Sequence, residues 1–294
     1  MDTELARTFL TVVAAGNFVK AAERLFVTQS TVSARIQSLE QQLGATLFVR
    51  NKAGTTLTPA GRQFQKHATS LMRTVERARQ DVGVPKGFRA SLTVGGRIGI
   101  WEALLLEALP EIRATAPDVA VRAEIGFEED LMQGLVEGRV DVGVMYAPQS
   151  RPGLVVETLF DEQLVLVSTD ADAGAHLGSN YVYVDWGPEF YARHSTVFPE
   201  ITGTGLSTNI GWLGLQHIRA FGGTAYFPRR LVAADVAAGR LHEIAGAPLF
   251  NLPVYLVFPF DRDADVFDPA LRVIRRIGSR VVTAIGNGTP SNGS

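Results

Sequence analysis

The spacing of apolar residues in the first part of the chain predicts three short helices. Apolar side chains recur every three or four positions, as on one face of a helix, over residues 3–15, up to about residue 26, and over residues 29–43. Asn17 and Thr28 are good N-caps for the second and third helices, because their side chains can accept hydrogen bonds from free backbone N–H groups. Three short helices with a tight turn between the last two have the spacing of a helix-turn-helix.

A hairpin and a long helix are expected next. Two β-prone runs, 47–50 and 55–58, flank a Gly-containing turn, and a hairpin here would form a wing. Pro59 favours the start of a helix that runs to about residue 82. The apolar positions of this helix alternate four and three residues apart: Phe64, Ala68, Leu71, Val75, Ala78 and Val82. We interpret this heptad stripe as a seam with a second chain rather than as packing on its own domain, because the three helices before it already form a complete unit.

The remainder of the chain alternates between strands and helices. Residues 83–90 are interpreted as a hinge, and the Gly/Asn/Ser/Pro-rich segment 286–294 as a disordered tail. Strands are expected at 91–95, 119–127 and 140–145, as a pair after Pro152 that leads to residues 163–168, and at 181–185, 206–210, 224–227 and 254–258. Helices are expected at 101–114, 129–137, 212–221, 229–238 and 268–284. This alternation is typical of parallel βαβ units and predicts a hinged domain of two α/β lobes, resembling a periplasmic-binding-protein fold.

Composition narrows the class of protein. The chain has 294 residues and no cysteine, which excludes disulfides, cysteine–zinc sites and thiol catalysis. The N-terminus does not read as a secretory signal, and no segment approaches 18 uninterrupted apolar residues, so we expect a soluble, cytoplasmic protein with no membrane partner. The net charge of −2 hides an asymmetry, since residues 1–89 carry +7 and the rest −9. A basic front part suits a polyanion partner and, equally, a solvated basic surface.

A more specific pattern runs through residues 3–61. Its positions are Phe9-Leu10, Val13, Gly16-Asn17-Phe18, Ala21-Ala22-Glu23-Arg24-Leu25, Val27-Thr28-Gln29-Ser30, Val32-Ser33, Ile36, Leu39-Glu40, Leu43-Gly44, Leu47-Phe48, Arg50 and Leu57-Thr58-Pro59-Ala60-Gly61. In this order and spacing they resemble the LysR-type transcriptional regulators of bacteria. Residues 222–228 and 239–241 resemble the effector domain of that family. Residues 1–5 and 27–33 also resemble the subgroup that contains the enterobacterial repressor of the flagellar master operon.

The resemblance implies an organisation and a set of partners. A winged helix-turn-helix at 1–58, a dimerising linker helix at 59–82, the hinge at 83–90, and a two-lobed effector-binding domain at 91–285 are expected, followed by the disordered tail at 286–294. The partners would be double-stranded DNA with a partly palindromic operator, a small-molecule effector, and a second copy of the chain, with dimers of dimers beyond that. RNA polymerase would be a further partner if the protein activates transcription. Activation and repression both stay open, and no cofactor is expected.

The third helix carries the side chains expected to read DNA. With Val32, Ile36 and Leu39 buried, the opposite face points away from the core, and the helix N-terminus is the end that enters the major groove. The candidate DNA-binding residues are Asn17, Lys20, Thr28, Gln29, Ser30, Thr31, Ser33, Arg35, Gln37, Arg50 and Lys52. Gln29 can pair with adenine, and the basic residues can contact phosphates, although each could equally be a solvated charge. Many family members have Arg where this chain has Ala34, so their base preferences cannot be copied.

The resemblance places the effector between the lobes, near the first strand-to-helix turn at residues 95–99. Glycines and a helix N-terminus at this turn suit an anion, and Arg97 can pair with a carboxylate, although it could also be a surface arginine. The effector is therefore expected to be a small anionic metabolite. The candidate effector-binding residues are Gly96, Arg97, Trp101, Tyr146, Trp186, Asn209 and Trp212, whose aromatic members could instead belong to the core.

Catalysis is not expected. The five histidines have no metal-ligand spacing, and the chain contains no Gly-x-Ser-x-Gly elbow or P-loop. A two-lobed solute-binding protein is an alternative interpretation of the rear part, and an enzyme with an accessory DNA-binding module is another. A gel shift with the protein's own upstream DNA and a ligand-induced melting shift on residues 88–294 discriminate these alternatives.

Overall fold

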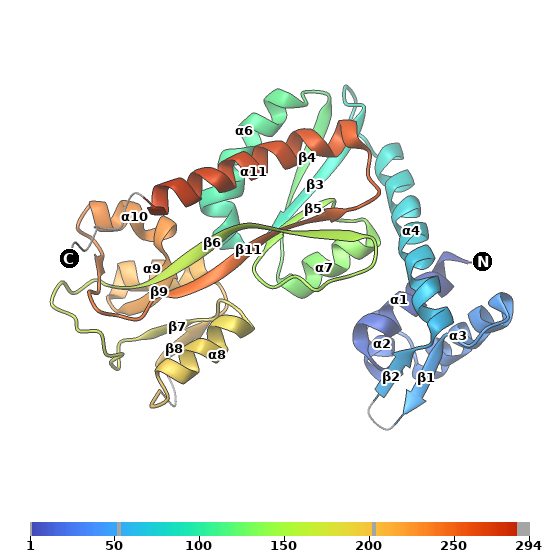
Figure 1. The fold of residues 1–294 in the computed structure, drawn as a ribbon, viewed down its shortest axis with the longest axis horizontal. Helices are drawn as coiled ribbons and strands as arrows, with labels where there is room; N and C mark the ends of the chain where they lie inside the picture. The colour runs from blue at the N-terminus through green and yellow to red at the C-terminus, as the bar shows by residue number, and fades with distance from the viewer. Residues whose placement is uncertain (1, 52–53, 202–203, 287–294) are drawn as a thin grey trace.

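The computed structural model describes residues 2–51, 54–201 and 204–286 (Figure 1). The N-terminal part contains, in order, α1 (Thr3–Ala15), α2 (Phe18–Leu25), α3 (Gln29–Leu43), β1 (Phe48–Asn51), β2 (Gly54–Leu57) and α4 (Pro59–Val82). The three predicted helices, the antiparallel hairpin and the long helix are confirmed. In Figure 1, α1–α3 and the hairpin form one unit, here called the N-terminal unit, and α4 leads from it toward the rest of the chain.

Capping residues set the ends of the short helices. Asn17 Oδ1 accepts a hydrogen bond from Lys20 N (2.7 Å), and Thr28 Oγ1 accepts one from Thr31 N (3.2 Å). Both side chains therefore satisfy N–H groups that have no partner within the helix. Gly16 ends α1 with a left-handed φ of 70°, which costs little only in glycine. These caps determine which residues occupy the first turn of α3.

Aromatic side chains form the centre of the N-terminal unit. The Phe9 ring lies 5.1 Å from the Phe48 ring and 4.9 Å from the Phe64 ring, and the Phe18 ring lies 5.8 Å from that of Phe48. Phe64 belongs to α4, so the first turns of the long helix are part of this core. They pack against α1.

This packing corrects the interpretation of the heptad stripe. Phe64 and Ala68 are buried in the core of their own chain, with 8% and 0% exposure, so the prediction that they lie in a seam between two chains is wrong. The three helices before α4 were not a complete unit after all, because α4 fills the side of the core that they leave open. At the far end of α4, Ala78 is exposed and Val82 is 91% exposed. Leu71 and Val75 are half-buried, so the fully exposed part of the stripe is this end of α4.

The rest of the chain is an α/β domain. Its elements, in order, are β3 (Ala90–Gly96), α5 (Ile98–Ile100), the π-helical turn η1 (Trp101–Leu105), α6 (Leu106–Thr115), β4 (Val119–Ile125), α7 (Glu128–Glu137), β5 (Val142–Met145), β6 (Leu154–Ser168), β7 (Val182–Val184), α8 (Pro188–Val197), β8 (Leu206–Thr208), α9 (Gly211–Phe221), β9 (Thr224–Pro228), α10 (Arg229–Ala237), β10 (His242–Glu243), β11 (Phe250–Pro259) and α11 (Ala264–Gly286).

A mixed sheet connects two lobes of this domain. The strand order is β10-β6-β11-β5-β3-β4, and β9 also pairs with β6. In the first lobe, β3 is parallel to β4 and β5, and α6 and α7 belong to the same lobe. The long antiparallel strands β6 and β11 run on into the second lobe, which contains β7–β9 and α8–α10 (Figure 1). The predicted two-lobed α/β domain is confirmed.

Some local expectations in this domain are wrong. Residues 154–168 form one strand of 15 residues instead of a strand pair, because β11 pairs with it from Leu154 to Leu164. Helix α8 was not expected; Pro188 opens it after Gly187, whose φ of 112° redirects the chain. The helix expected at 101–114 begins at Ile98 and passes through the π-helical turn η1.

The connecting and terminal segments complete the description. Residues 83–89 join α4 to β3, and Arg89 N donates to Asp118 O (2.8 Å) at the end of this segment. Of the tail expected at 286–294, only Gly286 is described, as the last residue of α11; residues 287–294 lie outside the described part of the chain. Within the described residues, none of the helices combines the length and apolar character needed to cross a bilayer.

Candidate functional site

The first turn of α3 lies on the surface of the N-terminal unit. Val32, Ile36 and Leu39 are buried, as predicted from their spacing. Gln29 and Ser30 are exposed on the other side of the helix. Backbone N–H groups at a helix N-terminus, together with amide and hydroxyl side chains, can donate hydrogen bonds to phosphate oxygens and base edges. The turn therefore has the chemistry needed to contact DNA.

The hydroxyl groups of this turn form a local cluster. Thr28 Oγ1 lies 2.8 Å from Ser30 Oγ and 2.8 Å from Thr31 Oγ1. Among the four residues 28–31, Gln29 has the longest side chain, and it is exposed. Further along the helix, Ser33 is half-buried and Gln37 is exposed. The hydroxyl cluster suits contacts close to the helix axis, whereas Gln29 can reach further.

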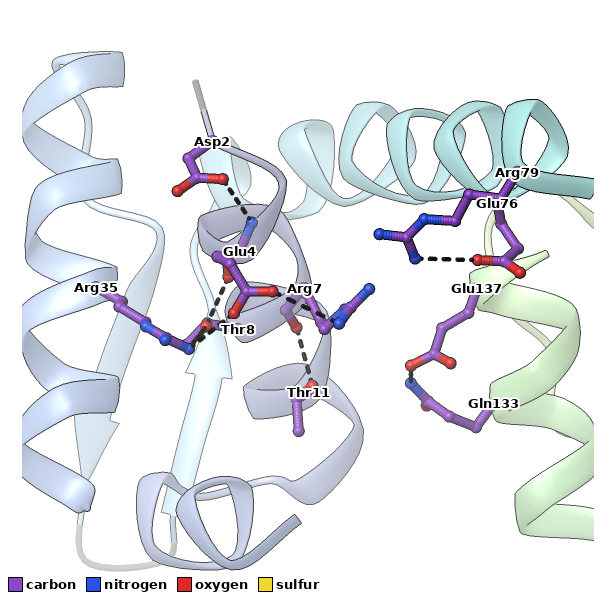
Figure 2. A network of polar contacts seen from close by, with 10 residues as sticks. All are labelled: Asp2, Glu4, Arg7, Thr8, Thr11, Arg35, Glu76, Arg79, Gln133 and Glu137. Carbon is purple, nitrogen blue, oxygen red and sulfur yellow. Dashed lines mark hydrogen bonds and ion pairs between the residues drawn. The ribbon is translucent and has the colours of Figure 1, made fainter. Parts of the chain in front are cut away.

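The predicted basic residues fall into different environments. Lys20 is exposed beside the Asn17 cap. Arg35 is half-buried, with Nη1 3.2 Å from Glu4 Oε2 and 3.3 Å from Thr8 Oγ1, so it ties α3 to α1 (Figure 2). Arg50 belongs to β1 of the wing, and Lys52 lies outside the described residues.

The second candidate region lies where strands of both lobes end. Arg97 directly follows β3 and is only 7% exposed. Its Nη1 donates to both carboxylate oxygens of Glu128 in the first lobe (3.2 and 3.3 Å). Its Nη2 donates to the backbone carbonyls of Asp185 (3.3 Å) and Asn209 (3.2 Å) in the second lobe. The guanidinium of Arg97 therefore joins the two lobes.

Aromatic rings surround this contact. The Arg97 Cζ atom lies 5.4 Å from the centroid of the Phe127 ring and 5.9 Å from that of Tyr146. The Trp186 ring stands edge-on to Tyr146 at 6.4 Å. Trp101 and Trp186 are 8% and 3% exposed, and each indole N–H donates to a backbone carbonyl. The structure brings Tyr146 to Arg97, while both tryptophans are packed and hydrogen-bonded as core residues.

The remaining predicted effector residues are placed as follows. A Cβ at Gly96 would lie 2.8 Å from Leu105 Cδ1, so the backbone here is closely packed. Asn209 is exposed but contributes its backbone carbonyl to Arg97. Trp212, in the first turn of α9, is 42% exposed.

A buried ion pair beside Tyr146 was missed by the sequence reasoning. Arg230 Nε donates to both carboxylate oxygens of Glu162 (3.0 and 2.9 Å), and the Tyr146 hydroxyl donates to Glu162 Oε2 (3.3 Å). Burial raises the pKa of the Tyr146 hydroxyl above its usual range, so this group stays a neutral donor. Glu162 and Arg230 are 68 residues apart on different elements, and no local pattern could have paired them.

The N-terminal unit also contacts the first lobe directly. Arg24, in the last turn of α2, forms an ion pair with Glu129 in the first turn of α7. Gln80 Nε2, near the end of α4, donates to Gly138 O (2.9 Å), just after α7. The α/β domain is thereby joined to the N-terminal part of the chain by more than the covalent link.

A polar hollow of about 860 Å³ lies at this junction and is lined by residues of α1, α2, α4 and α7. Figure 2 shows Arg7 on α1 facing α4 and α7. On α4, Glu76 and Arg79 pair at 3.5 Å, and on α7, Gln133 donates to Glu137 (2.7 Å). Four arginines and four acidic residues line the hollow, so its formal charges balance and it is not a strongly charged site. Among the described residues, no cluster of three or more His, Asp or Glu side chains could hold a metal ion.

Comparisons with known sequences cover both parts of the chain. Residues 3–62 match the bacterial regulatory helix-turn-helix proteins of the lysR family, and residues 85–177 match the LysR substrate binding domain. The HTH-type transcriptional regulator HdfR of Yersinia enterocolitica is 32% identical over 240 residues, which is 78% of this chain and 81% of the relative.

Solved structures agree in fold. The full-length regulator LysG of Corynebacterium glutamicum with its bound effector Arg has a TM-score of 0.56 at 17% identity, covering 95% of this chain and 99% of that chain. DarR of Vibrio fischeri in complex with DNA has a TM-score of 0.56 at 17% identity, covering 94% of this chain and 98% of that chain. At these identities the likeness concerns the arrangement of the helices and strands.

Proposed function

Because the chain belongs to the LysR family of DNA-binding transcriptional regulators, we propose that the first turn of α3 enters the major groove and that Gln29 reads a base there. The protein is a transcriptional regulator with an effector-binding domain and not an enzyme. The observation that carries the proposal is the exposure of Gln29 and Ser30 opposite the buried Val32 and Ile36. A glutamine in this place can bond to adenine N6 and N7 at once.

The other candidate side chains would position the unit on the backbone of DNA. Ser30 lies in the first turn of α3, Asn17 caps α2 and Lys20 lies in the first turn of α2, and we propose that these side chains contact phosphates, as Arg50 and Lys52 would. Thr28, Thr31, Ser33 and Gln37 complete the proposed surface. Arg35 is already paired with Glu4, so its proposed contribution is the weakest of the set.

We propose that two chains form a dimer through α4. The operator would then be partly palindromic. Support comes from the exposed Ala78 and Val82 at the end of that helix. LysR regulators form oligomers, and a dimer would set two α3 helices on two half-sites. A tetramer made of two such dimers, and contact with RNA polymerase where the protein activates transcription, belong to the same proposal. Its work on chromosomal DNA would place the protein in the cytoplasm.

The effector would bind between the lobes, where β3, β7 and β8 end. In open α/β sheets, ligands bind outside the carboxyl ends of the strands, and LysG carries its effector Arg in the same overall fold. An anionic effector would have to displace the Glu128 carboxylate from Arg97. That the effector is an anion stays a prediction. We propose that residues 1–58 form the DNA-binding domain, 59–82 the dimerising helix, 83–90 the hinge and 91–285 the effector-binding domain.

The test is a gel shift and footprint on DNA from upstream of the protein's own gene, beside random DNA of equal length. Sequence-specific reading requires a protected, partly palindromic site at protein concentrations that leave random DNA free. Equal affinity for both DNAs over a range of salt concentrations would contradict the proposal, because binding would then rest on phosphate contacts alone.

A further inference from the structure

The environment of Arg97 has the composition of a binding site for a cation. Glu128 supplies a carboxylate, the carbonyls of Asp185 and Asn209 supply two further acceptors, and Phe127 and Tyr146 supply two aromatic rings within 6 Å of Cζ. Carboxylates, carbonyl oxygens and ring faces all attract a guanidinium and repel an anion. The Arg97 side chain is only 8% exposed.

The charges nearby do not favour an added anion. Arg230, whose side chain is 10% exposed, already pairs with Glu162, which also accepts from the Tyr146 hydroxyl. Glu102, in η1, adds a further half-buried carboxyl whose pKa is raised by burial. Among the described residues at this contact, each arginine therefore has a carboxylate partner, although Nη1 of Arg230 is buried without a hydrogen-bond partner. An anion at Arg97 would have to displace Glu128.

The groups around Arg97 come from both lobes. Glu128 and Phe127 follow β4 and Tyr146 follows β5 in the first lobe, whereas Asp185 and Asn209 follow β7 and β8 in the second. A guanidinium placed here is bonded on one edge to the first lobe and on another edge to the second. Planarity and donors on several edges allow this, and a compact ammonium has no equivalent geometry.

We propose that the contact between the lobes around Arg97 is a guanidinium-binding site that the chain fills with its own Arg97, which acts as a tethered ligand and clamps the lobes together. This inference rests on the proposed function, since it concerns the region between the lobes assigned there to the effector. A tethered group has a high effective concentration at its site. A free ligand must therefore displace Arg97, or the lobes stay clamped without one.

The experiment removes the tethered group and supplies it in solution. Arg97→Ala deletes the side chain beyond Cβ, and ethylguanidinium reproduces the deleted atoms. We expect the melting temperature to fall by about 5–10 °C, and millimolar ethylguanidinium to restore at least half of the loss, in the full-length protein. Ethylurea, which has nearly the same shape and no charge, should not restore it.

Two matched controls separate the site from general effects. Wild type, with its site filled, should gain no stability from ethylguanidinium. Arg276→Ala removes an exposed arginine that pairs with Glu111, and that variant should show no rescue. In the double variant Arg97→Ala/Glu128→Gln, the ethylguanidinium concentration needed for the same rescue should rise at least tenfold, because the carboxylate is gone.

The proposal is overturned if Arg97→Ala has the melting temperature of wild type, if ethylguanidinium fails to raise the melting temperature of the variant, or if ethylurea raises it equally well. Should the alanine variant fail to fold, Arg97→Lys takes its place. Lysine offers one nitrogen in place of the two that bond to Glu128 and to the two carbonyls, so a wild-type melting temperature for Arg97→Lys would also overturn it. The proposed function fails by a different test, if wild-type protein leaves no specific footprint on DNA. The rescue experiment does not depend on DNA, so the two failures can be told apart.

Discussion

Glu128 and Glu129 are neighbours in the first turn of α7, yet they pair with arginines from different parts of the molecule. Glu128 contacts Arg97, which bonds to the second lobe, and Glu129 contacts Arg24 at the end of α2. Consecutive residues of a helix point about 100° apart, so one turn can present both carboxylates to different partners. The contact between the lobes and the contact with the N-terminal unit are thus adjacent on one rigid helix.

The first prediction concerns the Arg24–Glu129 pair. Both side chains are exposed, at 42% and 69%, so the pair should contribute no more than about 1 kcal/mol. If proteolysis follows the population of molecules in which the N-terminal unit has separated, Glu129→Gln should raise cleavage within residues 83–89 by about 1.5- to 5-fold at low salt. High salt should reduce the difference between wild type and variant. Glu107→Gln, on exposed α6 surface, is the control, and equal cleavage of all three proteins at low salt would contradict the prediction.

The second prediction separates base reading from phosphate contact. Gln29→Ala should cost about 1–3 kcal/mol on the specific site and leave binding to random DNA nearly unchanged, because only a base contact is lost. Lys20→Ala should instead weaken binding to both DNAs and flatten the salt dependence. Titrations at several salt concentrations measure both effects. An equal loss on specific and random DNA for Gln29→Ala would refute the base contact.

The third prediction distinguishes the two ends of α4. Val82→Asp changes an exposed residue, so it should shift the dimer toward monomer in light scattering while the melting temperature of the monomer changes little. Phe64→Ala changes a residue of the chain's own core and should destabilise the N-terminal unit by about 3–5 kcal/mol. A Val82→Asp protein that remains fully dimeric would place the pairing surface elsewhere.

The fourth prediction concerns pH. His194 is buried, with Nε2 2.9 Å from the Tyr181 hydroxyl, and burial lowers the pKa of His194 to about 4. Between this value and the ordinary pKa of about 6.5, the unfolded chain binds the proton more tightly than the folded one. The stability contributed by neutral His194 is therefore complete above about pH 6.5 and is lost as the pH falls toward about 4, by up to roughly 1.4 kcal/mol per pH unit.

Melting curves at several pH values in this window measure the effect. His194→Gln should lose stability less steeply with falling pH than wild type, whereas His67→Gln, which changes an exposed histidine, should follow wild type. Parallel pH profiles for wild type and His194→Gln would show that another group controls the acid limit.

The sequence predicted best what depends on near neighbours. The bounds of α1, α3 and α4 follow from caps and periodicity within a few residues of each end, and these helices were placed correctly. Gln29 and Ser30 were found on the exposed face of α3 for the same reason. The family resemblance placed Arg97 at a turn between the lobes, with a surface arginine as the alternative, and the structure buries it there.

The partners of Arg97 were out of reach. Glu128, Asp185 and Asn209 lie 31, 88 and 112 residues away along the chain, and only the packing of one lobe on the other brings them together. The burial of Phe64 shows the same limit, since its heptad position fits a seam with a second chain and a core within one chain equally well. Periodicity identifies the buried face of a helix but not the surface that buries it.

The strands β6 and β11 pass from one lobe into the other as a continuous hydrogen-bonded ribbon, interrupted only by the change of register between Val254 and Tyr255. Such a ribbon does not act as a single hinge point. Opening the lobes must bend and twist the whole pair of strands, and the resistance to this grows with the angle. The lobes can therefore swing only as far as the ladder flexes before its hydrogen bonds break.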